Sequence, residues 1–96
     1  MEFLVNIEIA LPDGLDPHRA DELRAAERER AAELARAGVL VRLWRAPGRW
    51  ANWGLWRAAG EPDLREALGS LPMYPYMSVQ IHPLDPHPND PARTQP

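Results

Sequence analysis

The sequence predicts an α+β fold in which strands and helices follow one another in the order βαββαβ. Near each end of the chain lies a stretch in which apolar and polar residues alternate, as in a half-buried strand. Two segments with helical spacing of apolar residues each have a proline at or near their start. Between these segments, a Pro-Gly pair interrupts an aromatic-rich stretch, as expected for a hairpin.

The first strand and the first helix have clear sequence signals. Residues 3–11, FLVNIEIAL, place apolar side chains at alternate positions and predict a strand. Asp16 followed by Pro17 fits an N-cap with proline at the first helical position. A long helix is therefore expected from Pro17 to Ala37, closed by Gly38.

The second half of the chain supplies the remaining elements. Pro47 and Gly48 provide the tight turn of a hairpin. The expected elements are strands at 39–46 and 49–58, a short helix from Glu61 to Gly69, and a last strand at 76–84. This order is the ferredoxin-like plan, with two helices on one face of an antiparallel sheet.

One face of such a sheet is left without helices and needs a cover. We expect two sheets to pack face to face as a dimeric α+β barrel, which also suits a chain with a modest core. Residues 1–85 form the expected domain. Residues 86–96, rich in proline and polar residues, are expected to be an extended tail, either disordered or strapped over a neighbouring subunit.

The composition excludes several classes of function. With a formal net charge of −3 and scattered arginines, the chain is not expected to bind nucleic acid. It contains no cysteine, so disulfides and thiolate metal sites are excluded. His18, His82 and His87 lack metal-ligand spacing with a carboxylate, so no metal site is expected. No apolar run approaches about 20 residues, and we expect a cytoplasmic protein without membrane contact.

Charged residues interrupt the apolar side of the first helix. A projection at about 100° per residue places Glu27 and Arg30 inside the apolar arc and Arg24 at its edge. Burying a charge is costly unless it is paired, so two interpretations stay open. Glu27 either forms a structural ion pair with one of the arginines, or it is a desolvated carboxylate in a binding site.

The aromatic residues of the hairpin point to a binding site. All four tryptophans fall within residues 43–56, LWRAPGRWANWGLW. Arg45 follows Trp44, and Asn52 lies between two further tryptophans. Aromatic side chains with a few convergent polar groups are the usual lining of a small-molecule pocket. We therefore expect this stretch to be part wall and part core, with Trp56 the best candidate for packing alone.

Several motifs together support a family resemblance. They are an opening strand that ends IALP, LRAAERERAAEL on the helix, LWRAPGRWAN across the hairpin, LREALGSLPMYPYM after it, and the HP at His87. From Met1 to about Pro88, the sequence thereby resembles the muconolactone Δ-isomerase family. The motif LWR-x-x-G-[RK]-[WY]-x-N, followed at a distance by LP-x-x-PYM, is a specific combination.

The resemblance implies a ferredoxin-like subunit, paired into α+β barrels and assembled further into a ring-like decamer. It also implies a shift of the ring double bond of muconolactone to give 3-oxoadipate enol-lactone without a cofactor, in the β-ketoadipate route of aromatic breakdown. Glu27 is the expected catalytic base and acid, because a carboxylate in an apolar pocket can take and return a proton. The expected substrate-binding residues are Arg24, Arg30, Trp44, Arg45, Asn52 and Tyr76.

The sequence departs from the family pattern at a few positions. The helix motif L-K-x-x-E-K stands here as LRAAER, so Arg24 replaces a lysine, and Asn6 replaces an arginine common in the first strand. Two alternative functions stay open: a relative with altered substrate, such as a tailoring enzyme on an aromatic or polyketide-like ring, and a non-catalytic barrel protein. A cavity beside Glu27 would favour an enzyme, whereas a sealed salt bridge would remove most of that support.

Overall fold

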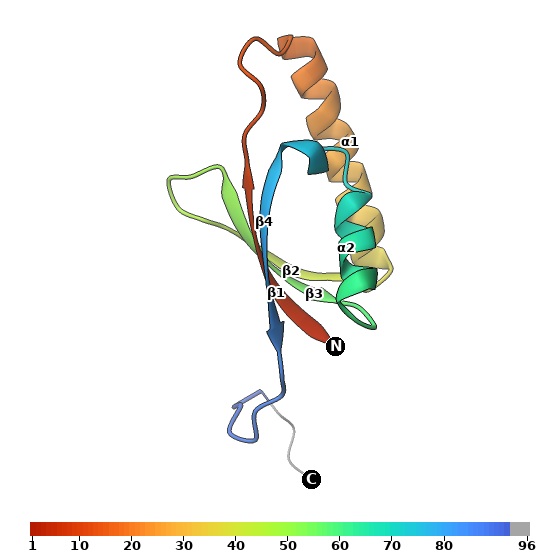
Figure 1. Ribbon diagram of the computed structural model, residues 1–96, viewed down its shortest axis with the longest axis vertical. Helices are drawn as coiled ribbons and strands as arrows, with labels where there is room; N and C mark the ends of the chain where they lie inside the picture. The colour runs from red at the N-terminus through yellow and green to blue at the C-terminus, as the bar shows by residue number, and fades with distance from the viewer. Residues whose placement is uncertain (93–96) are drawn as a thin grey trace.

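The computed structural model describes residues 1–92, which form one four-stranded sheet with two helices on one of its faces (Figure 1). The elements in order are β1 (Glu2–Ile9), α1 (Pro17–Arg36), β2 (Leu40–Arg45), β3 (Ala51–Arg57), α2 (Glu61–Gly69), the 3-10 turn η1 (Tyr74–Tyr76) and β4 (Met77–Leu84). Neighbouring strands run antiparallel in the order β2-β3-β1-β4. The predicted α+β, ferredoxin-like fold is confirmed.

Local capping explains the limits of α1. The Asp16 carboxylate accepts a hydrogen bond of 3.1 Å from the backbone N–H of His18, and Pro17 occupies the first turn. At the other end, Gly38 has a φ of +78°, a conformation that glycine adopts without steric cost. These two signals begin and end the helix within one residue of the predicted limits.

The core lies between the sheet and the helices. Alternate residues of β1 project into it, and Phe3, Val5 and Ile7 are almost fully buried. The other buried members of this cluster are Leu34, Trp56, Leu64, Leu68 and Leu71. Together they anchor α1 and α2 to the same face of the sheet, so the opposite face has no helix over it (Figure 1).

A β-bulge in β2 sets which of its side chains face the helices. Leu40 pairs with Trp56, but Arg42 pairs with Leu55, so Val41 is an extra residue in the register. Beyond the bulge, the even-numbered residues of β2 no longer share a face with Leu40. The side chains at 43 and 45 therefore turn towards α1, and those at 42 and 44 turn away.

Beyond β4 the chain runs on as a short exposed segment. Residues 85–92 contain only turns and irregular backbone, and they extend away from both helices (Figure 1). The predicted tail covers 86–96, of which residues 93–96 lie outside the described part of the chain. Within residues 1–92, no helix is long and apolar enough to cross a membrane.

Candidate active site

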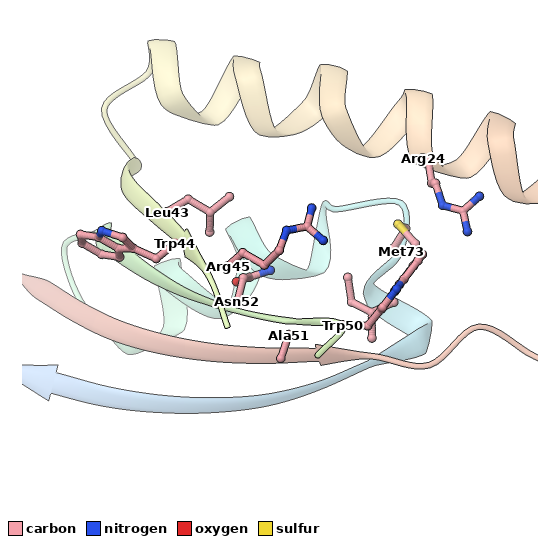
Figure 2. Close-up of a pocket in the computed structure, with 9 residues that line it drawn as sticks. Arg24, Leu43, Trp44, Arg45, Trp50, Ala51, Asn52 and Met73 are labelled. Carbon is pink, nitrogen blue, oxygen red and sulfur yellow. The ribbon is translucent and has the colours of Figure 1, made fainter. Parts of the chain in front are cut away.

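A cavity of about 450 Å³ opens between the N-terminal half of α1 and the β2–β3 hairpin (Figure 2). Its lining residues are Ile9, Arg24, Leu43, Trp44, Arg45, Trp50, Ala51, Asn52 and Met73. The wall is mainly apolar, and its polar side chains are two guanidinium groups and one amide. A cavity of this size and composition suits a small anionic molecule.

Arg45 and Asn52 come together because they are partners across the β2–β3 ladder. The bulge in β2 turns Arg45 towards α1, and the pleat of β3 does the same for Asn52. Figure 2 shows the two side chains next to each other beneath α1. In addition, the Asn6 side chain donates a hydrogen bond of 3.2 Å to the backbone carbonyl of Asn52 and so ties β3 to β1.

Glu27 lies on the sheet-facing side of α1 and is half-buried. Its carboxylate accepts a hydrogen bond of 2.9 Å from the backbone N–H of Met73. No arginine or histidine in residues 1–92 lies within ion-pair distance of it. Burial raises the pKa of Glu27 above its ordinary value, while the hydrogen bond from Met73 partly opposes this rise. Glu27 is thus a desolvated, unpaired carboxylate, as the second interpretation of the sequence supposed.

A second, smaller cavity of about 40 Å³ lies beside Glu27. It is lined by Ile7, Glu27, Ala31, Leu40, Leu43, Asn52, Trp56, Leu71 and Met77. Leu43 and Asn52 also line the larger cavity, and Met73, whose N–H binds Glu27, does so too. The carboxylate therefore lies next to the large cavity, because the two cavities share the side chains of Leu43 and Asn52.

Arg24 reaches the large cavity from α1 and is held there by an aromatic ring. Its guanidinium carbon lies 5.1 Å from the centre of the Trp50 indole, a cation–π distance. It also makes an exposed ion pair of 3.3 Å with Asp21. Trp50 is 55% exposed although it lines the cavity. Trp50 is not among the site residues predicted above, although its position two residues before Asn52 is a signal for it.

Three other predicted site residues differ from Arg24, Arg45 and Asn52 in how they lie relative to the large cavity. Arg30 donates a hydrogen bond of 3.0 Å to the hydroxyl of Ser70 and lines neither cavity. Tyr76, in η1, is half-buried and is also absent from both linings. Trp44 borders the large cavity, but its indole points away from Arg45 (Figure 2) and lies 4.8 Å beneath the guanidinium of Arg42.

The histidine of β4, His82, lies on the opposite face of the sheet. His82 pairs with Leu4 of β1, whose neighbours Phe3 and Val5 point into the core, so its side chain lies on the face without helices. The His82 ring centre is 6.2 Å from that of Trp53. Glu27 and His82 thus lie on opposite sides of the sheet.

Comparison with known proteins assigns the chain to a family. Residues 1–90 match the family model described as muconolactone delta-isomerase. Muconolactone Delta-isomerase of Pseudomonas aeruginosa is 38% identical over 89 residues, which cover 93% of each chain. That of Rhodococcus opacus is 36% identical over 88 residues, covering 92% of this chain and 95% of the relative. A crystal structure of muconolactone isomerase superposes with a TM-score of 0.89 at 33% identity and covers 100% of both chains. This protein therefore belongs to the muconolactone delta-isomerase family.

Proposed function

We propose that this protein is a cofactor-independent isomerase that shifts the ring double bond of muconolactone, or of a related unsaturated lactone, to give 3-oxoadipate enol-lactone. The match to the family along nearly the whole chain supports this function over both alternatives considered for the sequence. The observation that carries the mechanism is the desolvated Glu27 carboxylate, which has no ion-pair partner in residues 1–92 and lies beside a cavity lined by guanidinium groups.

In the proposed reaction, Glu27 moves one proton between two ring carbons. The carboxylate removes the proton from the ring carbon that bears the carboxymethyl arm, and the electron pair passes through the ring to the lactone carbonyl oxygen. The resulting dienolate then takes the same proton back from the Glu27 carboxylic acid at the carbon next to the carbonyl. A raised pKa suits both steps, because a base and its conjugate acid work best when their pKa is near the operating pH.

The polar groups of the large cavity fit the two negative charges of the reacting molecule. Asn52 lines both cavities and is therefore close to Glu27, which suits an amide donor to the dienolate oxygen. Arg45 and Arg24 line the large cavity and suit the substrate carboxylate, which a guanidinium can bind through two parallel hydrogen bonds. The apolar side chains around them exclude water and strengthen these contacts.

A homo-oligomer completes the proposal. The sheet face without helices carries Leu4, Leu55 and Trp53 among polar side chains, and Trp53 is exposed. An apolar, uncovered sheet face is suited to packing against a second copy, as in an α+β barrel, and such dimers could assemble further into a decamer. We also propose a cytoplasmic location. Light scattering at micromolar concentration should give a dimer or a multiple of it, and a stable active monomer would contradict this assembly.

The proposed activity can be tested with muconolactone in D₂O. Proton NMR should show loss of the substrate's ring-carbon proton signal and appearance of the enol-lactone, at a rate unaffected by EDTA. Metal-independence is expected because the scheme uses only Glu27 and hydrogen-bond donors of the protein. Failure of the purified oligomer to convert muconolactone would reject this substrate, and saturable binding without conversion would favour a relative with altered substrate.

A further inference from the structure

Two buried polar atoms lie beside Glu27 without a hydrogen-bond partner in residues 1–92. They are the side-chain oxygen Oδ1 of Asn52 and the indole nitrogen Nε1 of Trp56. Trp56 is only 2% exposed, and it lines the same 40 Å³ cavity as Glu27 and Asn52. Buried polar groups in folded proteins are nearly always hydrogen-bonded to protein or to ordered water, so these two atoms call for a partner.

In the described structure, the protein groups around the small cavity leave these two atoms without a hydrogen-bond partner. The indole N–H of Trp56 is a donor only, whereas the Asn52 oxygen and an ionised Glu27 carboxylate are acceptors only. The two acceptors cannot bond to each other, and Asn52 Oδ1 lacks a protein donor among the described residues. A water molecule has the complementary set, because it can accept one hydrogen bond from the indole and donate one to each acceptor.

The small cavity has room for a water molecule but not for a whole substrate molecule, which would occupy the large cavity beside it. A volume of about 40 Å³ exceeds the minimum of roughly 10–15 Å³ for one water, but it is far too small for a lactone ring with a carboxymethyl arm. Gly54 lies against the Trp56 indole that lines the cavity, because a Cβ atom there would lie 2.5 Å from Trp56 Nε1. Glycine at this position lets the indole nitrogen lie close against the β3 backbone.

We infer that the small cavity binds one structural water, which accepts a hydrogen bond from Trp56 Nε1 and donates to Asn52 Oδ1 and to the Glu27 carboxylate. Trp56 is thereby a positioning residue for Glu27, in addition to its part in the core. The presence of this water does not depend on which substrate the protein converts. Its catalytic consequence rests on the proposed function: the water holds the Asn52 amide with its NH₂ group free for the large cavity, and it keeps the carboxylate oriented.

The first test is a crystal structure of the wild-type oligomer at a resolution that places waters. One water peak is expected within about 2.7–3.2 Å of Trp56 Nε1, Asn52 Oδ1 and a Glu27 oxygen. A cavity with no peak, or a rearranged side chain that fills it, would overturn the inference. This measurement uses no lactone, so it is independent of whether muconolactone is the substrate.

The second test removes only the indole N–H. Site-specific replacement of Trp56 by 3-(3-benzothienyl)alanine keeps the size and shape of the ring and puts sulfur in place of the N–H. Glu27 is the only titratable side chain that lines the small cavity, and the guanidinium groups of Arg24 and Arg45 line the neighbouring one. With the water lost, the carboxylate loses a hydrogen bond to its charged form, so its pKa measured by ¹³C NMR should move to higher pH.

The matched control is the same replacement at Trp53, which lies on the other face of the sheet. It should leave the titration of Glu27 unchanged. A Trp56 replacement that lowers the thermal midpoint but does not move the Glu27 titration would show a packing role alone and overturn the positioning role. If the titration moves while muconolactone is not converted, the water site stands and the proposed function is rejected.

Discussion

Replacement of Glu27 by glutamine removes the proposed proton-transfer group and keeps the structure of the site. Glutamine has the same shape, and its amide oxygen can still accept the hydrogen bond from Met73 N–H, which is 2.9 Å long in the wild type. No ion pair in residues 1–92 is broken, since none involves Glu27. The substitution therefore removes the base and changes little else.

The expected loss follows from the role assigned to the carboxylate. A positioned general base contributes roughly 10²- to 10⁴-fold to a rate. This factor corresponds to about 2.7–5.4 kcal/mol of activation free energy at 1.36 kcal/mol per tenfold. The loss should appear in kcat, whereas KM should change little, because the groups proposed to bind the substrate carboxylate, Arg24 and Arg45, are untouched.

Initial rates with muconolactone, followed by NMR, give both parameters. The control is Glu29→Gln, a substitution of similar chemistry at an exposed position of the same helix, which should keep wild-type activity. If Glu27→Gln and Glu29→Gln have equal activity on a confirmed substrate, another group moves the proton and the assignment of Glu27 is refuted.

The Glu27→Gln variant should also differ from wild type in how its thermal midpoint depends on pH. Burial raises the pKa of folded Glu27 above 4.5, so the folded state binds this proton more tightly than the unfolded state does. The stability it contributes is present below the unfolded pKa and is lost as pH rises through the folded pKa. Relative to wild type, Glu27→Gln should therefore gain in thermal midpoint between pH 4 and neutral pH, and a loss over that range would contradict the desolvation of Glu27.

Three further substitutions test the rest of the site. Arg45→Met should lower kcat/KM by about 10- to 150-fold, from the loss of about 1.5–3 kcal/mol of charge-assisted hydrogen bonding; normal turnover by a folded variant would assign this arginine to structure. Trp50→Ala should raise KM by about 2- to 5-fold, because the guanidinium it stacks against loses about 0.5–1 kcal/mol of cation–π contact; an unchanged KM would exclude a role in binding. Gly54→Ala should lower the unfolding free energy by about 1–3 kcal/mol, since its Cβ would meet Trp56 at 2.5 Å. Gly69→Ala, which meets no atom within 4 Å, is its control, and equal denaturation midpoints would contradict the overlap.

The order of elements could be predicted because the chain marks their ends with residues of restricted conformation. Asp16, Pro17 and Gly38 limit α1, and the alternation of apolar residues identifies β1. The strands end less sharply: β1 stops at Ile9, two residues before the predicted limit. Apolar residues continue to Leu11, whereas the pairing of β1 with β4 ends at Ile9.

The lining of the candidate cavity was predicted in part, and the rotation of α1 about its axis explains the difference. An apolar arc projected from the sequence alone includes Ala26 and Ala37, but both are exposed, so the buried arc is centred nearer to Glu27 and Ala31. The rotation carries Arg24 into the cavity and moves Arg30 to its partner Ser70. Alanine is a poor guide to a buried face, because it is common on both sides of helices.

The bulge at Val41 has a consequence for how relatives of this protein are compared. Specificity in the cavity depends on register as well as on residue identity, since one unpaired residue decides whether the guanidinium of Arg45 or the indole of Trp44 faces the ligand. A homologue with the same letters but an unbulged strand would offer an aromatic plane where this chain offers a cation. Arg24 would then be the only guanidinium left among the lining residues that the structure describes, and the cavity would hold an anion less tightly. Aligned sequences would score these positions as identical, and only the pairing of the two strands would reveal the exchange.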